Sequence, residues 1–351
     1  MTRRTTPRTV RRRTALAVAG ASMALVLAGC GGEETGNEAA VNDDGSVDLE
    51  QVTLIVGDQK SSSQQAMLEA AGEDDTPYDI QWEEFTSGPP MMEALGTGAI
   101  HLGYVGNTPP IFAAASGSEL KVVQATTYTG LGDSILVPKD SDLQSVEDLA
   151  GKTVAVAEGS SANYNLLAQL REAGVDLEEV EQRNLQPADG LAAFSQGFID
   201  AWVVWEPYVS QAVIEEDARV LADGEDVVNG MNFQVASDVA LDDAATEAAV
   251  EDYVQRITRA QVWASDNQQE WSEVWAEQTG LSPDVTLAAA KKRPLTVLPV
   301  DGEVVDSEQE ISDTFTDADL LPEAVDVADY FDGRYDEQLA PLVEETADNA
   351  R

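Results

Sequence analysis

The sequence predicts an α/β fold with mainly parallel sheets, and three observations support this class. Short apolar runs typical of buried strands occur at 52–57 and 152–157. Helical and strand patterns alternate along the chain, and the helix expected over 162–173 stops at Gly174, a residue type favoured just beyond helix C-termini. Segment 98–107 can be laid over 197–206, since each follows a short helix and leads into proline. Strands that alternate with helices need crossover connections, which place the strands parallel.

The internal similarity predicts two alike lobes, each with a strand that ends at a helix N-terminus. Coincidence between two unrelated strand–helix units is the alternative. The chain beyond its N-terminal leader has the length of one two-lobed unit or of two domains. After residue 240 the pattern becomes long and helical over 245–265 and 267–279, with tryptophans at helical spacings that we assign to the core.

The charge balance excludes several classes of partner. The chain has 65 acidic against 20 basic residues and a formal net charge of −45. Nucleic-acid binding needs a basic footprint, and adhesion to anionic lipids needs basic clusters. The acids are spread along the chain, and 43% of the residues are hydrophobic, which is enough for a core. We interpret the acidity as surface adaptation, to salt or simply for solubility.

The N-terminus indicates export. Residues 1–13 carry six arginines and no acid, and an apolar run follows over 15–28. This order is typical of a signal peptide, and the run is too short for a stable transmembrane helix. It ends in Leu-Ala-Gly-Cys, which resembles a bacterial lipobox. We therefore expect a signal peptide over 1–29 and lipidation of Cys30, the only cysteine, which leaves no intramolecular disulfide.

The protein is thus expected outside the cytoplasm, anchored to the cell membrane by lipidated Cys30. Residues 30–50 are polar and acidic without periodicity, and we interpret them as a flexible tether between lipid and fold. The three arginines at 11–13 leave the export route open between the general secretory and twin-arginine pathways.

Four segments share one design, in which a strand or loop passes through small or capping residues into a helix. They lie at 86–90, 106–110, 159–163 and 205–208. Proline is favoured in a first helical turn, and Ser, Thr and Asn cap free N–H groups. Helix N-termini bind anions, and open α/β sheets bind ligands beyond the carboxyl ends of their strands. Several termini on both sides of a lobe boundary therefore predict a cradle for a small anion.

Catalysis finds little support in the sequence. The single histidine, His101, lies in a strand-like run, where a structural role is the simpler interpretation. The sequence has no His/Cys/Asp cluster with metal-ligand spacing, no P-loop and no dinucleotide fingerprint. Because a serine nucleophile needs a base, we interpret Ser160 and Ser161 as hydrogen-bond donors. We expect a binding protein without catalytic residues, metal or cofactor.

At these same segments the sequence resembles the aliphatic sulfonate-binding proteins of ABC importers, within the wider nitrate, sulfonate and taurine group. The resemblance covers roughly 52–330. Its pieces lie at 57–60, 82–89, 103–110, 135–139, 158–164, 187–189, 200–207 and 220–224, with Arg293 further on. The most specific part is Gly-Asn-Thr-Pro-Pro at 106–110 together with Gly-Ser-Ser-Ala-Asn-Tyr at 159–164.

The resemblance implies a two-lobed periplasmic-binding-protein fold of type II, which closes on its ligand by a hinge. Lobe 1 would comprise 51–137 plus 235–335, lobe 2 would comprise 138–234, and 336–351 would be a C-terminal tail. The ligand would be a small organic anion, an alkanesulfonate. The partners would be the permease of an ABC transporter with its ATPase, and we expect the binding protein to be a monomer.

Ligand contacts of the family type carry over to ten residues. They are Gln59, Ser87, Gly106, Asn107, Thr108, Ser160, Ser161, Asn163, Trp205 and Arg293. By the resemblance, Gln59 and the hydroxyl donors would hold sulfonate oxygens and Trp205 would flank the organic part. Arg293 would either add charge or form a surface ion pair.

Five positions depart from the usual pattern of the family. Asp58 stands where Tyr is frequent, Asn163 where His is frequent, and Asp is frequent at the positions of His101, Asn107 and Glu206. The two asparagines keep donors but change their geometry, which leaves the exact ligand open. Glu206 would repel a sulfonate beside it, so we expect it to cap its helix or to serve the hinge.

Three alternatives remain. The same fold could bind taurine, nitrate or a thiamine-pyrimidine precursor. An enzyme that makes such pyrimidines could share the fold, although the missing His/Cys chemistry and the export signal oppose this. A lipid-anchored adhesion or sensory module with an empty cleft is the third.

Overall fold

The computed structural model describes residues 37–321 and 323–347. The expected signal peptide, Cys30 and the first part of the expected tether lie outside these residues. Within the described part, no helix is both long and apolar enough to cross a membrane.

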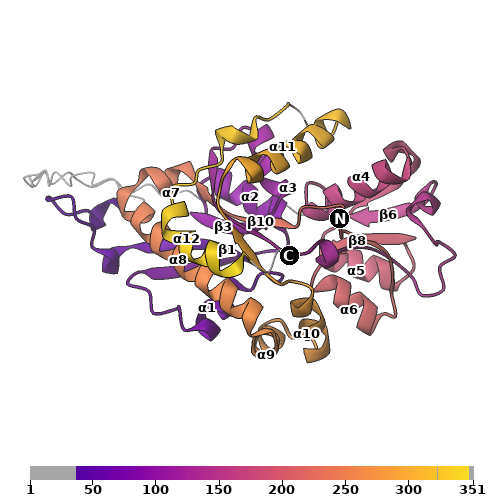
Figure 1. The fold of residues 1–351 in the computed structure, drawn as a ribbon, viewed down its shortest axis with the longest axis horizontal. Coiled ribbons are helices and arrows are strands. Elements are labelled where there is room, and N and C mark those ends of the chain that lie inside the picture. Colours follow the sequence, from indigo (N-terminus) through magenta and orange to yellow (C-terminus); the bar gives the residue numbers. More distant parts are fainter. Residues whose placement is uncertain (1–36, 322, 348–351) are drawn as a thin grey trace, which may run out of the picture. The chain divides into compact units, whose positions relative to one another are not determined.

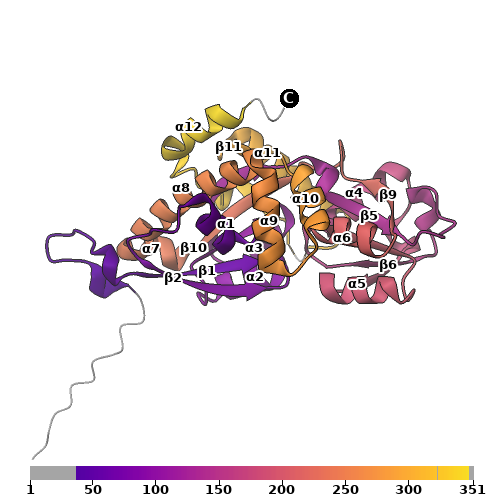
Figure 2. The ribbon, with the colours of Figure 1, turned by 90° about the horizontal axis from the view of Figure 1, so that it is seen from below.

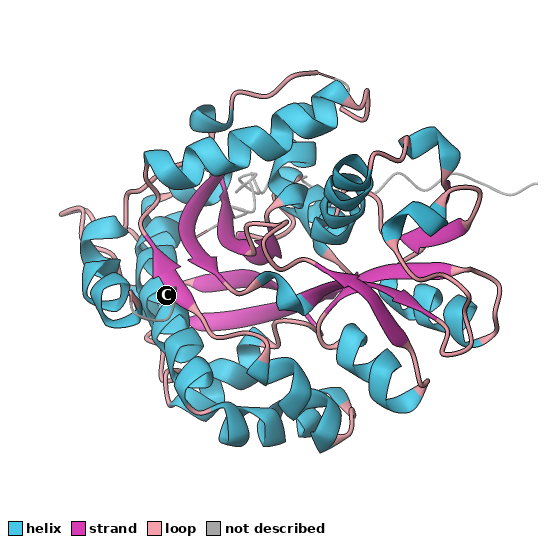
Figure 3. Cartoon of the chain, turned by 45° about the vertical axis from the view of Figure 1, so that its right-hand side comes forward, coloured by secondary structure: helices cyan, strands magenta, loops and turns pink. Residues whose placement is uncertain are grey.

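Two mixed sheets form the framework of the described chain (Figures 1 and 3). The first has the strand order β11-β4-β10-β3-β1-β2, and the second has the order β7-β6-β8-β5-β9. The strands are β1 Thr53–Gln59, β2 Asp79–Phe85, β3 Leu102–Gly106, β4 Leu120–Thr127, β5 Asp133–Val137, β6 Thr153–Val156, β7 Glu181–Asn184, β8 Ala201–Trp205, β9 Arg219–Asp223, β10 Met231–Ser237 and β11 Thr296–Leu298. We call the first sheet with its helices lobe 1 and the second lobe 2.

Helices cover both faces of each sheet. They are α1 Gln64–Ala71, α2 Gly88–Gly96, α3 Thr108–Ala115, α4 Ser161–Ala173, α5 Pro187–Ser195, α6 Tyr208–Glu215, α7 Asp238–Asp242, α8 Ala244–Asp266, α9 Gln268–Thr279, α10 Pro283–Lys291, α11 Gly302–Asp317 and α12 Asp336–Thr346. In lobe 1, α1, α8, α9 and α12 pack on one face of the sheet, and α2 and α11 pack on the other. In lobe 2, α4, α5 and α6 bury the apolar strands β6 and β8.

The two lobes repeat one pattern, which confirms the internal similarity seen in the sequence. In lobe 1, β1 runs parallel between β2 and β3, and in lobe 2, β6 runs parallel between β7 and β8. Helix α2 precedes β3 as α5 precedes β8, and helices α3 and α6 follow these strands. The carboxyl ends of β1, β3, β6 and β8 are therefore equivalent places in the two lobes.

Two crossing segments join the lobes, one after β4 and one after β9. They touch at Gly130 and Gly224, where the Gly224 amide donates to the Gly130 carbonyl at 3.2 Å. A Cβ atom on Gly130 would collide with the Gly224 backbone. Glycine at 130 is what lets the two crossing segments lie against each other.

Two predicted boundaries between the lobes were wrong. Strand β5 was expected in lobe 1, but it pairs with β8 and β9 of lobe 2. Strand β10 begins within the expected lobe 2, yet it pairs with β3 and β4 of lobe 1. Apolar strand runs look alike in either sheet, so only tertiary pairing separates them.

Both ends of the described chain are more ordered than we expected. The expected tail at 336–351 contains helix α12, whose Leu339 is buried in the core of lobe 1. The end of the expected tether holds two short 3₁₀ turns, Glu38–Ala40 and Leu49–Gln51. Asn37 fixes this stretch to the fold, because its side chain bonds the backbone of Thr53 and the Thr246 hydroxyl.

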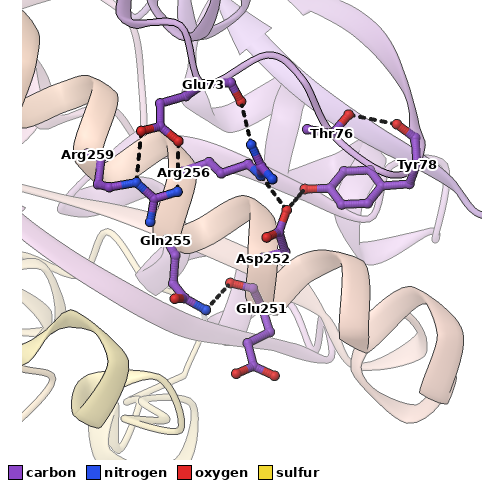
Figure 4. A network of polar contacts seen from close by, with 8 residues as sticks. All are labelled: Glu73, Thr76, Tyr78, Glu251, Asp252, Gln255, Arg256 and Arg259. Carbon is purple, nitrogen blue, oxygen red and sulfur yellow. Dashed lines mark hydrogen bonds and ion pairs between the residues drawn. The ribbon is translucent and has the colours of Figure 1, made fainter. Parts of the chain in front are cut away.

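A polar network fastens the loop between α1 and β2 to helix α8 (Figure 4). Arg259 holds the Glu73 carboxylate with two nitrogens at 2.9 and 2.7 Å. The Tyr78 hydroxyl donates to Asp252 at 3.0 Å, and Asp252 also pairs with Arg256. This network stabilises lobe 1 on a side that contributes no residue to the pocket described below.

Candidate functional site

A polar pocket of about 50 Å³ lies between the lobes, at the carboxyl ends of the central strands. Lobe 1 contributes Gln59, the last residue of β1, and Gly106, the last residue of β3. Lobe 2 contributes Ser160, the N-cap of α4 after β6, and Trp205, the last residue of β8. The equivalent places of the two lobes thus face one cavity, as expected for ligand sites of open α/β sheets.

Seven of the ten residues expected at the site line this pocket. They are Gln59, Gly106, Asn107, Ser160, Ser161, Trp205 and Arg293. Sequence analysis missed several other lining residues, among them Tyr104, Tyr128, Thr129, Asp133 and Asn232. Tyr128, Thr129 and Asp133 belong to the crossing region, where the sequence carries neither a motif nor a helix start.

The N-termini of α3 and α4 meet at the pocket. Ser160 caps α4 by accepting from the Asn163 amide at 3.3 Å. Prolines occupy the first turn of α3 and present no N–H there. A Cβ atom on Gly106 would lie 3.1 Å from Cβ of Ser161, so the absent side chain lets the two lobes approach. Asn107 and Ser160, which precede the two helices, line the pocket, so the positive ends of both dipoles lie at its wall.

Arg293 supplies the cationic group of the pocket. It follows α10, and its guanidinium lies over the Tyr128 ring at 4.8 Å from the centroid. One of its N–H groups donates to the Ser61 carbonyl at 2.9 Å. This stacking and this bond fix the guanidinium plane, and its further N–H donors remain suited to a planar fork contact with anionic oxygens.

Asp133 places a carboxylate in the same pocket. It accepts from the Ser161 hydroxyl at 3.4 Å and lies in the field of Arg293. Burial raises the pKa of Asp133 to about 6, although Arg293 and the Ser161 bond act in the opposite direction. The pocket therefore combines one fixed cation with an acid that titrates near neutral pH.

Three expected contacts lie outside the pocket wall. The Ser87 hydroxyl donates to Oε1 of Gln186 at 2.7 Å. The Thr108 hydroxyl donates to Oδ1 of Asn107 at 2.9 Å. The Asn163 side chain folds back and accepts from the Gly159 amide at 3.1 Å. These residues position the helix starts instead of facing the cavity.

Two expectations about single residues are confirmed. Glu206 is fully buried and caps α6 through the Ser210 amide and hydroxyl, at 3.0 and 2.8 Å. It also forms an ion pair of 2.7 Å with Lys292, which joins lobe 2 to the end of α10. His101 has a structural role, because its Nδ1 accepts from the Ile55 amide at 3.1 Å.

A partly buried chain of hydrogen bonds leads from the pocket toward α11. Asn107 donates to Oδ1 of Asn229 at 2.8 Å, and Asn229 donates to Oε1 of Glu308 at 2.8 Å. Burial raises the pKa of Glu308 to about 8. Its Oε2 atom has no hydrogen-bond partner, which fits a protonated carboxyl group. No trio of His, Cys, Asp or Glu within the described ranges is arranged to hold a metal ion.

Two alike α/β lobes that enclose a polar pocket between them define the class of periplasmic solute-binding proteins. The chain belongs to the NMT1-like family, whose pattern it matches over residues 48–278. A protein of Escherichia coli strain K12 whose name describes an aliphatic sulfonates-binding protein is 35% identical over 249 residues. These residues make up 71% of this chain and 77% of that relative.

Solved structures agree with this assignment. The alkanesulfonate-binding protein of Xanthomonas axonopodis pv. citri, bound to MOPS, is 32% identical with a TM-score of 0.74, covering 80% of this chain and 97% of that chain. The periplasmic aliphatic sulphonate-binding protein of Escherichia coli is 33% identical with a TM-score of 0.70, covering 79% and 91%. The predicted two-lobed fold is thereby confirmed. A desulfurization enzyme at 15% identity and a TM-score of 0.57 shares the fold alone.

Proposed function

We propose that this chain captures an alkanesulfonate in the pocket between its lobes and delivers it to an ABC importer. The observation that carries the proposal is Arg293, held in a polar pocket where the N-termini of α3 and α4 converge. The names of the sulfonate-binding relatives support the same ligand class.

The physical chemistry of the pocket suits a sulfonate. Such a group carries a permanent negative charge on three oxygens and has no acidic proton. It therefore needs donors and positive potential from several directions. The Arg293 guanidinium and the N-terminus of α4 provide donors, and the N-terminus of α3 adds the positive end of its dipole. The hydroxyls of Ser160 and Ser161 and the amide of Gln59 lie in the same wall. Trp205 adds an apolar surface to the lobe 2 side of the same pocket.

The net charge of −45 does not prevent anion capture. The Debye length is about 8 Å at physiological ionic strength, so distant surface acids are largely screened. Donors inside the pocket act at about 3 Å, where screening is weak. Capture is thus governed by the pocket, and the surface charge mainly slows the encounter at low salt.

Outside the cytoplasm, the proposed working form is a monomer anchored by a lipid on Cys30. The arginine-rich start, the apolar run and the lipobox-like ending support this proposal. A substrate-delivery role is also supported by two observations on possible catalysis. His101, the single histidine, is engaged in the fold, and the named relatives are binding proteins.

A thermal-shift panel tests the ligand class. Purified protein is heated with alkanesulfonates, taurine, nitrate and a thiamine-pyrimidine precursor. A ligand at about 100 times its Kd stabilises by about 2.7 kcal/mol, which raises the Tm of a protein of this size by several degrees. We expect the largest shift with an alkanesulfonate. A shift with the pyrimidine alone would overturn the proposal.

A further inference from the structure

A second pocket adjoins the first inside lobe 1. It has a volume of about 30 Å³ and lies between α1, α8, α9 and α10, which pack together (Figure 2). Both pockets are lined by Tyr104, Tyr128 and Arg293, and by Ser61 and Ser62. The guanidinium of Arg293 therefore lies at the boundary between the two pockets.

The walls of this second pocket are apolar over much of their surface. Helix α9 contributes Trp271 and Trp275, whose rings stack at 5.7 Å with an interplanar angle of 14°. Met67 lines it from α1, and Ala264 and Ala290 line it from α8 and α10. A thioether side chain adapts its shape easily, so Met67 can make room for a slim chain.

One polar atom in this wall lacks a partner. Gln64 is fully buried, and its Oε1 accepts from the Tyr253 hydroxyl at 2.8 Å and from Nε2 of Gln234 at 3.2 Å. Its own Nε2 is buried without a hydrogen-bond acceptor. A buried donor without an acceptor is unfavourable, and a guest that brings an acceptor removes that deficit.

We propose that this second pocket, here named the tail pocket, receives the organic end of the bound sulfonate. The inference rests on the proposed function, because Arg293 would hold the sulfonate at the entrance. The fitting ligands are unbranched sulfonates of a few chain atoms that carry an ether or hydroxyl oxygen within reach of Gln64. Branched or bulky groups should bind less well, because the pocket has a volume of only about 30 Å³.

Calorimetric titration with three ligands tests the inference on the wild-type protein. Methanesulfonate has no tail, butanesulfonate has an apolar tail, and 2-methoxyethanesulfonate has the same chain length with an ether oxygen. Each methylene that enters the pocket should lower Kd about fourfold. The ether should bind at least as tightly as butanesulfonate although it is more polar, because its oxygen accepts from Gln64.

Filling the tail pocket should change the preference for chain length. We expect Ala290→Leu to raise the ratio of the butanesulfonate Kd to the methanesulfonate Kd about tenfold, since one to two methylenes lose their place. Ala288→Leu adds the same side chain to the same helix outside the lining and should leave this ratio as it is. Ala264→Leu fills the pocket from α8 and repeats the test if Ala290→Leu does not fold.

The possible outcomes distinguish a failure of the tail-pocket inference from a failure of the proposed function. If no sulfonate binds the wild-type protein, the proposed function fails. If methanesulfonate binds while the chain-length ratio stays the same in every folded pocket-filling variant, the tail lies elsewhere and the inference is overturned. A butanesulfonate affinity no higher than that of methanesulfonate in the wild-type protein overturns it as well.

Discussion

The hydroxyl of Ser87 donates to Oε1 of Gln186 at 2.7 Å and so connects lobe 1 to lobe 2. Ser87 is the N-cap residue of α2, and Gln186 is the N-cap residue of α5. They stand 99 residues apart, at the same place in the two repeated lobes. The Thr86 hydroxyl donates to the same oxygen at 3.1 Å. The duplicated helix starts thus form a bridge that holds the lobes closed.

Removing this bridge should weaken ligand binding without touching the pocket. We expect Gln186→Ala to raise the ligand Kd about tenfold, because two hydrogen bonds of the closed form are lost and closure is part of binding. Gln186→Glu keeps the accepting oxygens and should restore affinity. Calorimetry measures the effect, with the exposed Gln196→Ala at the other end of α5 as the control. Unchanged affinity in Gln186→Ala would refute the role of the bridge.

Loss of the pocket cation should abolish most of the affinity. We expect Arg293→Ala to raise the alkanesulfonate Kd at least 100-fold, since truncating one partner of a buried charge pair costs about 2–5 kcal/mol. Arg293→Lys keeps the charge but loses the planar guanidinium that stacks on Tyr128, and it should recover only part of the affinity. The control is Arg259→Ala, which breaks the ion pair with Glu73 in Figure 4. Equal losses in both variants would contradict a specific role for Arg293.

Acid should strengthen binding through Asp133. In the free pocket the pKa of Asp133 is raised to about 6 by burial, and an anion beside it must raise this pKa further. The bound form then holds a proton that the free form releases, so affinity is highest below pH 6 and falls as the pH rises above it. The other charges near Asp133 are Arg293 and the Glu206–Lys292 pair.

Calorimetry between pH 5 and 8, repeated in buffers of different ionisation enthalpy, measures this proton uptake. Asp133→Asn should bind with a nearly constant affinity across the same range. An affinity that instead rises with pH would mean that the ligand brings its own cation to Asp133, as an aminoalkanesulfonate would.

The free energy of unfolding should fall as the pH rises from about 4.5 to about 8 because of Glu308. Burial raises its pKa from 4.5 to about 8, so the folded protein keeps a proton that the unfolded chain releases. The stabilisation is complete below pH 4.5 and is lost as the pH rises through 8, by up to about 1.4 kcal/mol for each pH unit. Denaturant unfolding of the wild type and of Glu308→Gln checks this. Parallel pH profiles for the two proteins would contradict it.

Much of the fold could be predicted because local patterns repeat. The run at 152–157 and the similarity between 98–107 and 197–206 reflect real strands at equivalent places. Strand β5 could not be assigned, because its apolar run would suit either sheet and its partners lie far away in sequence. Helix α12 was missed although Leu339 and Leu342 recur at helical spacing and pack on the core, because the segment is acidic and holds Pro341.

The site was predictable where it is built from helix starts. Gly106, Asn107, Ser160 and Ser161 lie at such starts and line the pocket. Asp133 could not be found, because its place depends on two crossing segments that no local pattern marks. Ser87 looked like another anion donor, but its hydroxyl bonds Gln186 across the lobes. A capping residue shows where a helix begins and not what lies opposite.

The central claim is that the pocket between the lobes holds a sulfonate against Arg293. Isothermal titration of the wild-type protein with methanesulfonate and butanesulfonate at pH 6 tests it most directly. The account predicts binding of one ligand per chain with a Kd on the order of micromolar for the better ligand, and its near-complete loss in Arg293→Ala. Titrations without heat up to millimolar sulfonate, or equal binding by wild type and Arg293→Ala, would contradict it.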